Sequence, residues 1–188
     1  MRVLVACEYS GKVREAFRRK GHDAWSCDLL PADDGSEFHI QGDCLDAMCD
    51  MGPWDIIIAH PPCTALCVSG NRWYGKGMPK HQERIDSIDW TMRLIYIAQN
   101  NSRIGCCIEN PVGVLPIKPT QYIQPWQFGH GETKKTGLWL HGLPPLEPTN
   151  IVDGREQRIW KLPPSADRWK IRSETFQGIA DAMADAWG

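Results

Sequence analysis

A cysteine follows two prolines directly after an apolar run in the middle of the chain. The run Trp54–Ala59 is followed by His60, Pro61, Pro62 and Cys63. Proline can neither donate to a β-ladder nor continue it, so this pattern predicts a buried strand that presents a thiol at its carboxyl end. Ligands bind at that edge of open α/β sheets. Cys63 is therefore a candidate nucleophile, although a small side chain that caps the core would fit the same position.

Acidic and polar side chains follow the other predicted strands in the same way. They are Cys7-Glu8, Asp28, Gly42-Asp43 and Glu109-Asn110. Parallel strands end along one edge of a sheet, so we expect these groups to lie near the thiol. Asp28 ends the second strand, where doubly wound folds bind ribose hydroxyls, and Asp43 is placed to accept from an adenine amine. A turn role for Asp28 and a helix-capping role for Asp43 are the structural alternatives.

The loop after the first strand indicates which kind of cofactor would bind. It reads Cys7, Glu8, Tyr9, Ser10 and Gly11, and it leads into a helix whose N-terminal amides attract polar or anionic groups. It lacks both the Gly-x-Gly-x-x-Gly spacing of dinucleotide binders and the Gly-Lys-Ser/Thr of phosphate loops. This combination predicts a nucleoside cofactor without phosphates, of which S-adenosyl-L-methionine is the common one.

The elements that would position these residues alternate between apolar runs and helical patterns. Strands are predicted at 2–7, 23–28, 38–40, 54–59, 104–109 and 136–140, and helices at 13–20, 44–48, 81–99 and about 175–187. This βαβ rhythm predicts an α/β fold with a mostly parallel sheet and helices on both faces. In the longest helix, one face is predicted from Ile85, Ile88, Met92, Ile95 and Tyr96. Residues 151–172 are predicted to form an irregular loop on the substrate side.

Composition limits the class of protein. A chain of 188 residues with 42% hydrophobic and 23% charged residues fits one globular domain. We expect neither a membrane span nor a leader peptide, and the eight cysteines lack the spacing of a disulfide framework. Free thiols in a reducing cytoplasm are therefore expected. A net charge of −2 is a weak electrostatic basis for holding duplex DNA.

Taken together, the motifs resemble the DNA cytosine (carbon-5) methyltransferase family, in a small phage-type form. Pro61-Pro62-Cys63 matches the Pro-Cys nucleophile motif of that family, and Glu109-Asn110 matches its Glu-Asn motif. Two later blocks, Phe128-Gly129 through Thr136 and Gln177-Gly178-Ile179-Ala180, resemble the family's basic strand block and its last cofactor motif. The resemblance implies a single catalytic domain over residues 1–188 with the class I, Rossmann-like methyltransferase fold. The stretch between the strand ending at Leu140 and the terminal helix is too short for a separate target-recognition domain.

The resemblance also implies roles for individual residues. Cys63 would add to carbon 6 of cytosine as a thiolate, favoured by the cationic cofactor and by His60 nearby. Glu109 would stabilise ring nitrogen 3, and Asn110 would orient the glutamate or the loop. The implied S-adenosyl-L-methionine site consists of Cys7, Glu8, Tyr9, Ser10, Gly11, Asp28, Leu29, Asp43, Cys44 and Pro62. The implied substrate site consists of Ser69, Asn71, Arg72, Lys134, Lys135 and Thr136, with residues 68–79 closing over the base and no metal site.

The chain departs from the family pattern at three points. Its first loop lacks the glycines, Pro111 follows the Glu-Asn motif in place of valine, and the expected Gln-x-Arg-x-Arg strand lacks its arginines. Lys134 or Lys135 would substitute for those arginines. Phosphate contacts and base stacking are expected from Arg155–Arg172, with its two tryptophans, unless these pack into the core.

The substrate and the class of the protein remain open at this stage. DNA with the cytosine flipped out, bound by one chain or by a homodimer, is one substrate hypothesis, and a free cytosine nucleotide is the other. An amino-methyltransferase is a further alternative, as is a zinc site at His60, Cys63 and Cys67. A non-catalytic module that binds a nucleotide or the cofactor is the last.

Overall fold

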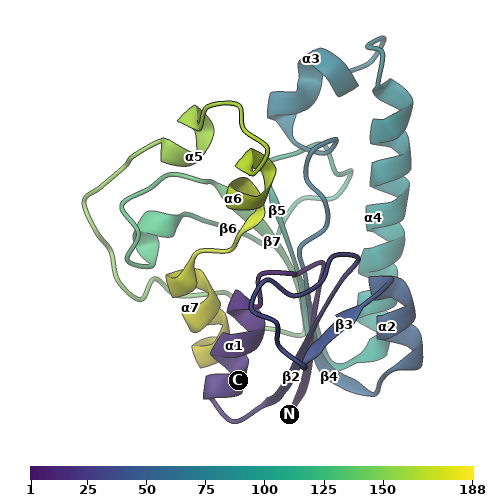
Figure 1. The fold of residues 1–188 in the computed structure, drawn as a ribbon, viewed down its shortest axis with the longest axis vertical. Helices are drawn as coiled ribbons and strands as arrows, with labels where there is room; N and C mark the ends of the chain where they lie inside the picture. Colours follow the sequence, from purple (N-terminus) through teal and green to yellow (C-terminus); the bar gives the residue numbers. More distant parts are fainter.

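Seven strands form one sheet with the order β3-β2-β1-β4-β5-β7-β6 in this computed structural model (Figure 1). The structure describes residues 1–188, except for the side chain of Trp160. The strands are β1 (Arg2–Ala6), β2 (Asp23–Asp28), β3 (His39–Gln41), β4 (Trp54–Ala59), β5 (Ser102–Pro111), β6 (Gln121–Ile123) and β7 (Thr136–His141). Neighbours from β3 to β5 are parallel, and β7 is antiparallel to β5 and β6. The predicted α/β fold with a mostly parallel sheet and helices on both faces is therefore confirmed.

Helices cover both faces of the sheet (Figure 1). α1 (Lys12–Arg19) and α7 (Gln177–Trp187) pack on one face, and α2 (Cys44–Asp50) and α4 (His81–Asn101) pack on the other. The remaining helices are short: η1 (Val68–Gly70), α3 (Asn71–Tyr74), η2 (Pro125–Gln127), α5 (Arg158–Lys161) and α6 (Arg168–Ser173). None of the helices in the described part of the chain is long and apolar enough to span a membrane.

The central strands are buried on both sides because their side chains alternate between two cores. Val3 and Val5 of β1 face the core under α1 and α7, and Leu4 faces the core under α2 and α4. Such continuous apolar strands are typical of parallel sheets covered on both faces. β4 ends where predicted. The N–H of His60 still donates to the Ala6 carbonyl at 3.0 Å, but Pro61 has no N–H with which to extend the hydrogen-bond ladder to β1. Cys63 therefore lies at the carboxyl edge of the sheet.

The predicted face of α4 was partly wrong. Ile85 and Tyr96 are exposed, whereas Arg84 is among the buried residues of the helix. Arg84 lies inside because its guanidinium donates to the carbonyls of Ala65 (2.7 Å) and Cys67 (3.1 Å). A polar side chain with buried partners can thus occupy a position that a hydrophobic pattern assigns to the surface.

The C-terminal half also differs from the prediction. The sequence pattern missed β6, and residues 151–172 contain α5 and the start of α6 in place of a wholly irregular loop. α6 is stabilised by tertiary contacts that no local pattern reveals, since Tyr9 Oη lies 2.8 Å from Ser173 Oγ and the Tyr9 and Trp169 rings lie 5.9 Å apart. The α6 segment therefore packs over the loop that follows β1.

Candidate active site

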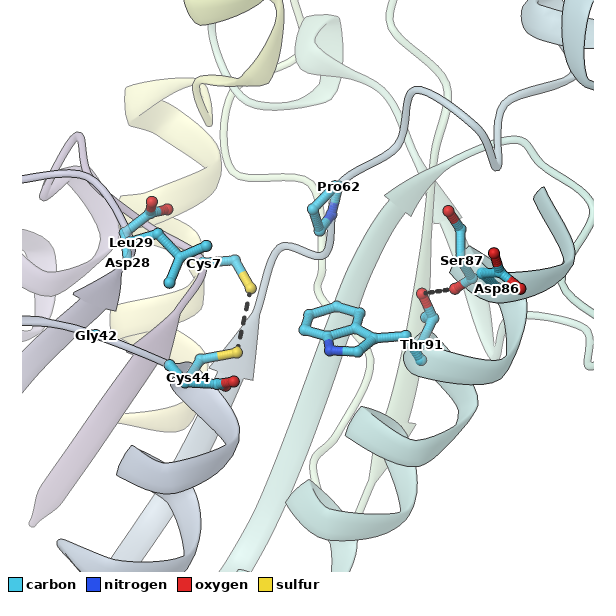
Figure 2. Close-up of a pocket in the computed structure, with 11 residues that line it drawn as sticks. Cys7, Asp28, Leu29, Gly42, Cys44, Pro62, Asp86, Ser87 and Thr91 are labelled. Carbon is cyan, nitrogen blue, oxygen red and sulfur yellow. Dashed lines mark hydrogen bonds between the residues drawn. The ribbon is translucent and has the colours of Figure 1, made fainter. Parts of the chain in front are cut away.

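A cavity of about 510 Å³ lies at the carboxyl ends of β1 and β2, facing α4 (Figure 2). Its walls are formed by Cys7, Asp28, Leu29, Gly42, Asp43, Cys44, Pro62, Asp86, Ser87, Trp90 and Thr91. The volume is within the range of about 300–1,000 Å³ that is typical of ligand sites. Most of the predicted cofactor residues line it, namely Cys7, Asp28, Leu29, Asp43, Cys44 and Pro62.

Sequence reasoning missed the wall of the cavity that α4 contributes. Asp86, Ser87, Trp90 and Thr91 face the strand ends across the cavity (Figure 2). The pattern predicted the helix, but not which face would lie over the edge of the sheet. Trp90, a large apolar residue outside the predicted apolar face, was the available signal.

Asp28 and Asp43 both take the local structural roles considered for them, a turn and a helix cap. Asp28 Oδ1 accepts the N–H of Leu30 at 2.9 Å, which is the predicted turn role. Asp43 caps α2, because its Oδ1 accepts the N–H of Leu45 at 2.8 Å. Both side chains also line the cavity. Their local hydrogen bonds hold the carboxylates in place at its wall.

Cys7 has an unusual backbone conformation at the edge of this cavity. Its φ of 57° lies in the left-handed region, which non-glycine residues rarely adopt and which concentrates at functional sites. The Cys7 and Cys44 sulfurs lie 3.6 Å apart (Figure 2). The pKa of Cys7 is raised well above its usual value. The hydrogen bond with Cys44 is the largest cause, and burial is the second. Cys7 is therefore a neutral thiol that forms part of the wall.

The rest of the first loop surrounds a smaller cavity of about 40 Å³ that shares Cys7 with the larger one. Glu8, Tyr9 and Ser10 line it, as predicted for the cofactor site, together with His60, Ser173, Glu174 and Thr175. Gly11 lines neither cavity. Its φ of 69° and the nearby guanidinium of Arg14 leave no room for a Cβ, so its role in this structure is to begin α1.

The N-terminal amides of α1, considered above as a ligand site, are occupied by Glu8. Its carboxylate accepts the N–H groups of Val13 (2.7 Å) and Arg14 (3.2 Å). Burial raises the pKa of Glu8, while the charge of His60 and these two N–H groups act in the opposite direction. A buried internal carboxylate thus takes the place that a ligand anion would have at this helix.

Cys63 lies in a turn just beyond Pro62, and its side chain is partly exposed. The Cys63 carbonyl accepts the N–H groups of Leu66 (3.1 Å) and Cys67 (2.9 Å), which closes the turn. A hydrogen bond from the Cys67 side chain lowers the pKa of Cys63 from 9.0 to about 7; burial and Glu109 oppose this, and Lys134 supports it. A substantial fraction of Cys63 is therefore the nucleophilic thiolate at neutral pH.

Glu109 projects from β5 next to this turn and is largely buried. His60 Nδ1 lies 2.9 Å from its Oε2. Burial raises the pKa of Glu109, but the hydrogen bond and charge of His60, the charge of Lys134 and a hydrogen bond from Thr136 outweigh it, so the pKa lies below its usual value. Glu109 is a carboxylate at neutral pH.

Asn110 supports the nucleophile turn. Its Nδ2 donates to the Pro61 carbonyl at 2.9 Å, and the residue is fully buried. Of the two roles considered for Asn110, this contact fits orientation of the loop. The two adjacent residues of β5 therefore have different contacts. Glu109 pairs with His60, and Asn110 holds the Pro61 carbonyl, two residues before Cys63.

Cys63, Glu109 and Lys134 lie within electrostatic reach of one another. The charge of Glu109 acts on the pKa of Cys63, and the charge of Lys134 acts on both groups. The buried Thr136 belongs to the same group. Lys135 does not, because its Nζ lies 4.3 Å from the centre of the exposed Tyr122 ring. Of the two candidate substitutes for the family's arginines, Lys134 is the one whose charge acts on Cys63 and Glu109.

The predicted lid at residues 68–79 is more structured than expected. Ser69 lies in η1, and Asn71 and Arg72 lie in α3. Asn71 Oδ1 accepts from Arg84 Nη1 at 2.8 Å, so Asn71 anchors this segment to α4. The Arg72 guanidinium lies 5.2 Å from the ring centre of Trp73, which is half exposed. Ser69 and Arg72 remain candidates for substrate contacts at the far end of the molecule from the termini (Figure 1).

Several basic residues between Arg155 and Arg172 are engaged within the chain. Arg158 Nη2 lies 2.8 Å from Glu132, and Lys170 Nζ lies 3.4 Å from Asp33. The Arg155 guanidinium lies 3.9 Å from the ring centre of Trp126. Trp169 is half exposed, while the side chain of Trp160 lies outside the described part of the structure.

The zinc hypothesis finds no support in the geometry. Within the described residues, no three or more His, Cys, Asp or Glu side chains are grouped so that they could hold a metal ion. The ring of His60 contacts Glu109 instead of joining Cys63 and Cys67 in a ligand set. The hydrogen bond between the two cysteines explains their proximity without a metal.

Comparisons with known proteins add little beyond the fold. No family model matches the chain, and no curated protein matches it. Among solved structures, a protein encoded within an E. coli prophage, provisionally described as a DNA modification methyltransferase, is similar with a TM-score of 0.49 and 14% identity. The alignment covers 81% of this chain and 52% of the other, so the chain spans about half the length of that protein.

Proposed function

We propose that this chain is an S-adenosyl-L-methionine-dependent methyltransferase that methylates carbon 5 of cytosine through a covalent adduct on Cys63. The observation that carries the proposal is the convergence of a thiol of pKa about 7 and a buried carboxylate, Glu109, at the carboxyl edge of the sheet. An amino-methyltransferase has no use for an activated thiol at this position. The large cavity beside Pro62 supports a cofactor site next to that thiol.

The residues present fit an adenosine. Asp28 can accept from ribose hydroxyls, and Asp43 can accept from the adenine amine. Leu29, Pro62 and Trp90 supply apolar walls on which a purine would pack. Cys7 joins this cavity to the smaller one, where Tyr9 and Ser10 would face the amino-acid end of S-adenosyl-L-methionine. When bound, the cofactor supplies an electrophilic methyl group.

Cys63 supplies the nucleophile. Carbon 5 of cytosine is a poor nucleophile, and addition of the Cys63 thiolate to carbon 6 turns the ring into an enamine that can accept a methyl group. The hydrogen bond from Cys67 and the charge of Lys134 hold Cys63 ready for this step by stabilising the thiolate. Asn110 keeps the Pro61 carbonyl, and with it the start of the turn, in place.

Glu109 would face the edge of the same ring. Its carboxylate can accept a hydrogen bond from the exocyclic amine and can handle a proton at ring nitrogen 3 as charge develops there during the attack. Lys134 and Thr136 fix the ionised form of Glu109. Loss of the carbon-5 proton and departure of the sulfur then complete the reaction.

We propose cytosine in DNA as the substrate, flipped out of the duplex and bound by one chain or a homodimer. A half-exposed Trp73 next to Arg72 and a half-exposed Trp169 next to Lys170 offer stacking surfaces beside positive charge. A free cytosine nucleotide is the second candidate, because the net charge of −2 and the internally paired basic residues reduce phosphate contacts.

The test is to offer the protein S-adenosyl-L-methionine with duplex DNA, single-stranded DNA, RNA and dCMP in parallel, and to measure 5-methylcytosine by mass spectrometry of nucleosides. We expect 5-methylcytosine with a DNA substrate and none with Cys63→Ser. Cofactor binding by calorimetry should be nearly the same in both proteins.

Cys49→Ser is the matched control, because Cys49 is an exposed thiol remote from both cavities. Transfer that survives Cys63→Ser would exclude the covalent route. Cofactor binding without transfer to any of the four substrates would favour a non-catalytic binding module, and product from dCMP alone would establish the free nucleotide as substrate.

A further inference from the structure

His60 lies between two buried carboxylates at the carboxyl edge of the sheet. Its Nδ1 is 2.9 Å from Glu109 Oε2, and the two side chains are only 8% and 12% exposed. On its other side His60 lines the smaller cavity together with Glu8, whose pKa is raised by burial although the charge of His60 acts in the opposite direction. The backbone N–H of His60 is bonded to the Ala6 carbonyl, so the ring projects from a fixed position.

The proposed reaction requires a proton that Glu109 does not hold by itself. When sulfur adds to carbon 6, the π electrons of the ring move toward nitrogen 3, which then takes a proton. Glu109 is ionised in the free protein because the bond to His60 and the charge of Lys134 outweigh its burial. The proton must therefore reach Glu109 from a group in contact with it.

We propose that His60 is the positioning residue that stores and returns this proton through Glu109, an inference that rests on the proposed function. As the C6–S bond forms and nitrogen 3 takes a proton from Glu109, Glu109 takes the Nδ1 proton of the imidazolium. When the carbon-5 proton leaves and the C6–S bond breaks, the proton on nitrogen 3 returns through Glu109 to His60. The only net proton released in the cycle is the one from carbon 5.

The charges around His60 suit this role. His60 Nδ1 lies against the carboxylate of Glu109 from β5, and Glu8 from the end of β1 and Glu174 line the small cavity together with the imidazole ring. Lys134 and Cys63 also lie within electrostatic reach of Glu109, and their charges are of opposite sign when Cys63 is a thiolate. Imidazole is the side chain that ordinarily gains and loses a proton between pH 5 and 8, the range in which the reaction would run.

The experiment compares His60→Asn with His60→Ala. The Asn side chain can place an N–H donor near the position of Nδ1 and so keep the bond to Glu109, but it cannot supply a proton, whereas Ala removes both. The readouts are kcat against pH with a cytosine-containing duplex, and exchange of the carbon-5 hydrogen of cytosine in deuterated water without cofactor. Both variants should lower kcat by about 10²-fold or more. The wild-type profile of kcat against pH should contain a component that both variants lack.

An unchanged kcat and pH profile in His60→Asn would overturn the relay and leave His60 as a hydrogen-bond donor that only orients Glu109. His22→Asn is the matched control, because His22 lies near the N-terminus, next to Phe17, and far along the chain from the thiol. If His60→Ala does not fold, His60→Asn decides alone, with melting curves and cofactor calorimetry as folding controls.

The outcomes also separate this inference from the proposed function. A wild-type protein that methylates cytosine and is inactivated by Cys63→Ser, but tolerates both His60 variants, refutes the relay alone. A wild-type protein that forms no 5-methylcytosine and exchanges no carbon-5 hydrogen refutes the proposed function and the relay with it.

Discussion

At the scale of single residues, the thiol of Cys63 and the carboxylate of Glu109 acquire their ionised forms from different neighbours. Cys63 depends first on the side chain of Cys67, four positions further along a closed turn. The ionised form of Glu109 depends on His60, which is distant in sequence and follows β4, the strand next to β5. The sequence drew attention to His60 as an aid to Cys63, whereas its observed hydrogen bond is to the glutamate.

The reactivity of Cys63 should follow its lowered pKa. Because the thiolate is the reactive form, the rate of alkylation by iodoacetamide should rise through about pH 7 and level off above about pH 8. Cys67→Ala removes the hydrogen bond and should move the midpoint up toward 9, whereas Cys67→Ser keeps a donor and should move it less. Peptide mass spectrometry after pH jumps measures this, with Cys63→Ser as the background. An identical midpoint in Cys67→Ala would show that Cys67 does not set the pKa.

Asp28 offers a second test at this scale, because turn formation and ribose binding can be separated. Asp28→Ala should weaken S-adenosyl-L-methionine binding by about 1–3 kcal/mol, the usual cost of leaving buried polar groups without a partner. Asp28→Asn keeps an acceptor for the Leu30 N–H and should therefore preserve the turn, but it should still weaken the binding of S-adenosyl-L-methionine. Calorimetry measures both, with Asp46→Ala on the exposed side of α2 as control. Unchanged affinity in both Asp28 variants would remove this residue from the site.

At the scale of secondary structure, α7 connects two blocks that the resemblance had identified separately. The N–H of Gly178 donates to His130 Nε2 at 2.9 Å, and the rings of His130 and Phe176 lie 5.0 Å apart. The start of α7 therefore packs directly on the Phe128–Gly129 segment. In this structure Gly178 supports the arrangement of the elements and lines neither cavity.

The close approach at Gly178 predicts a loss of stability on substitution. A Cβ added there would overlap the Phe128 carbonyl oxygen, a backbone atom that cannot move aside without shifting the segment. Gly178→Ala should therefore cost about 1–3 kcal/mol, as overpacking usually does. In a chain of this size each kcal/mol lowers the melting temperature by about 2–4 °C. Gly42→Ala is the control, because a Cβ at that position meets open space, and equal melting temperatures for both variants would contradict the packing described here.

At the scale of the whole molecule, the candidate catalytic and cofactor residues lie at one edge of the sheet, and segments from both ends of the chain pack around that edge. The loop after β1 contacts α6 through Tyr9 and Ser173, and Lys12 at the start of α1 lies 2.6 Å from Glu174, which follows α6. The nucleophile turn after β4 and Glu109 of β5 lie beside these contacts. The site therefore depends on the complete sheet order.

The overall charge predicts weak binding to DNA of arbitrary sequence. The chain has 21 basic and 23 acidic residues, and several of the basic ones pair internally. Affinity for a random duplex should therefore be near the non-specific range of about 10⁻⁴–10⁻⁶ M at physiological salt and should fall as salt rises. Fluorescence anisotropy with labelled duplexes at 50 and 200 mM salt measures this. Nanomolar, salt-insensitive binding would indicate an interface other than phosphate contacts.

The sequence alone determined the alternation of strands and helices from β1 to β5, the stop after β4 and the set of polar residues at the strand ends. It could do so because apolar periodicity, proline chemistry and strand-end placement are local properties that a parallel sheet turns into one edge. Only the tertiary structure decided which partners those residues have. α4 supplied the opposite wall of the cavity, and Glu8 occupied the α1 amides. Lys134 rather than Lys135 came within electrostatic reach of Cys63 and Glu109, and His60 bonded Glu109. Each of these contacts joins segments whose packing depends on how the helices cross the sheet, and that crossing is not encoded in any local pattern.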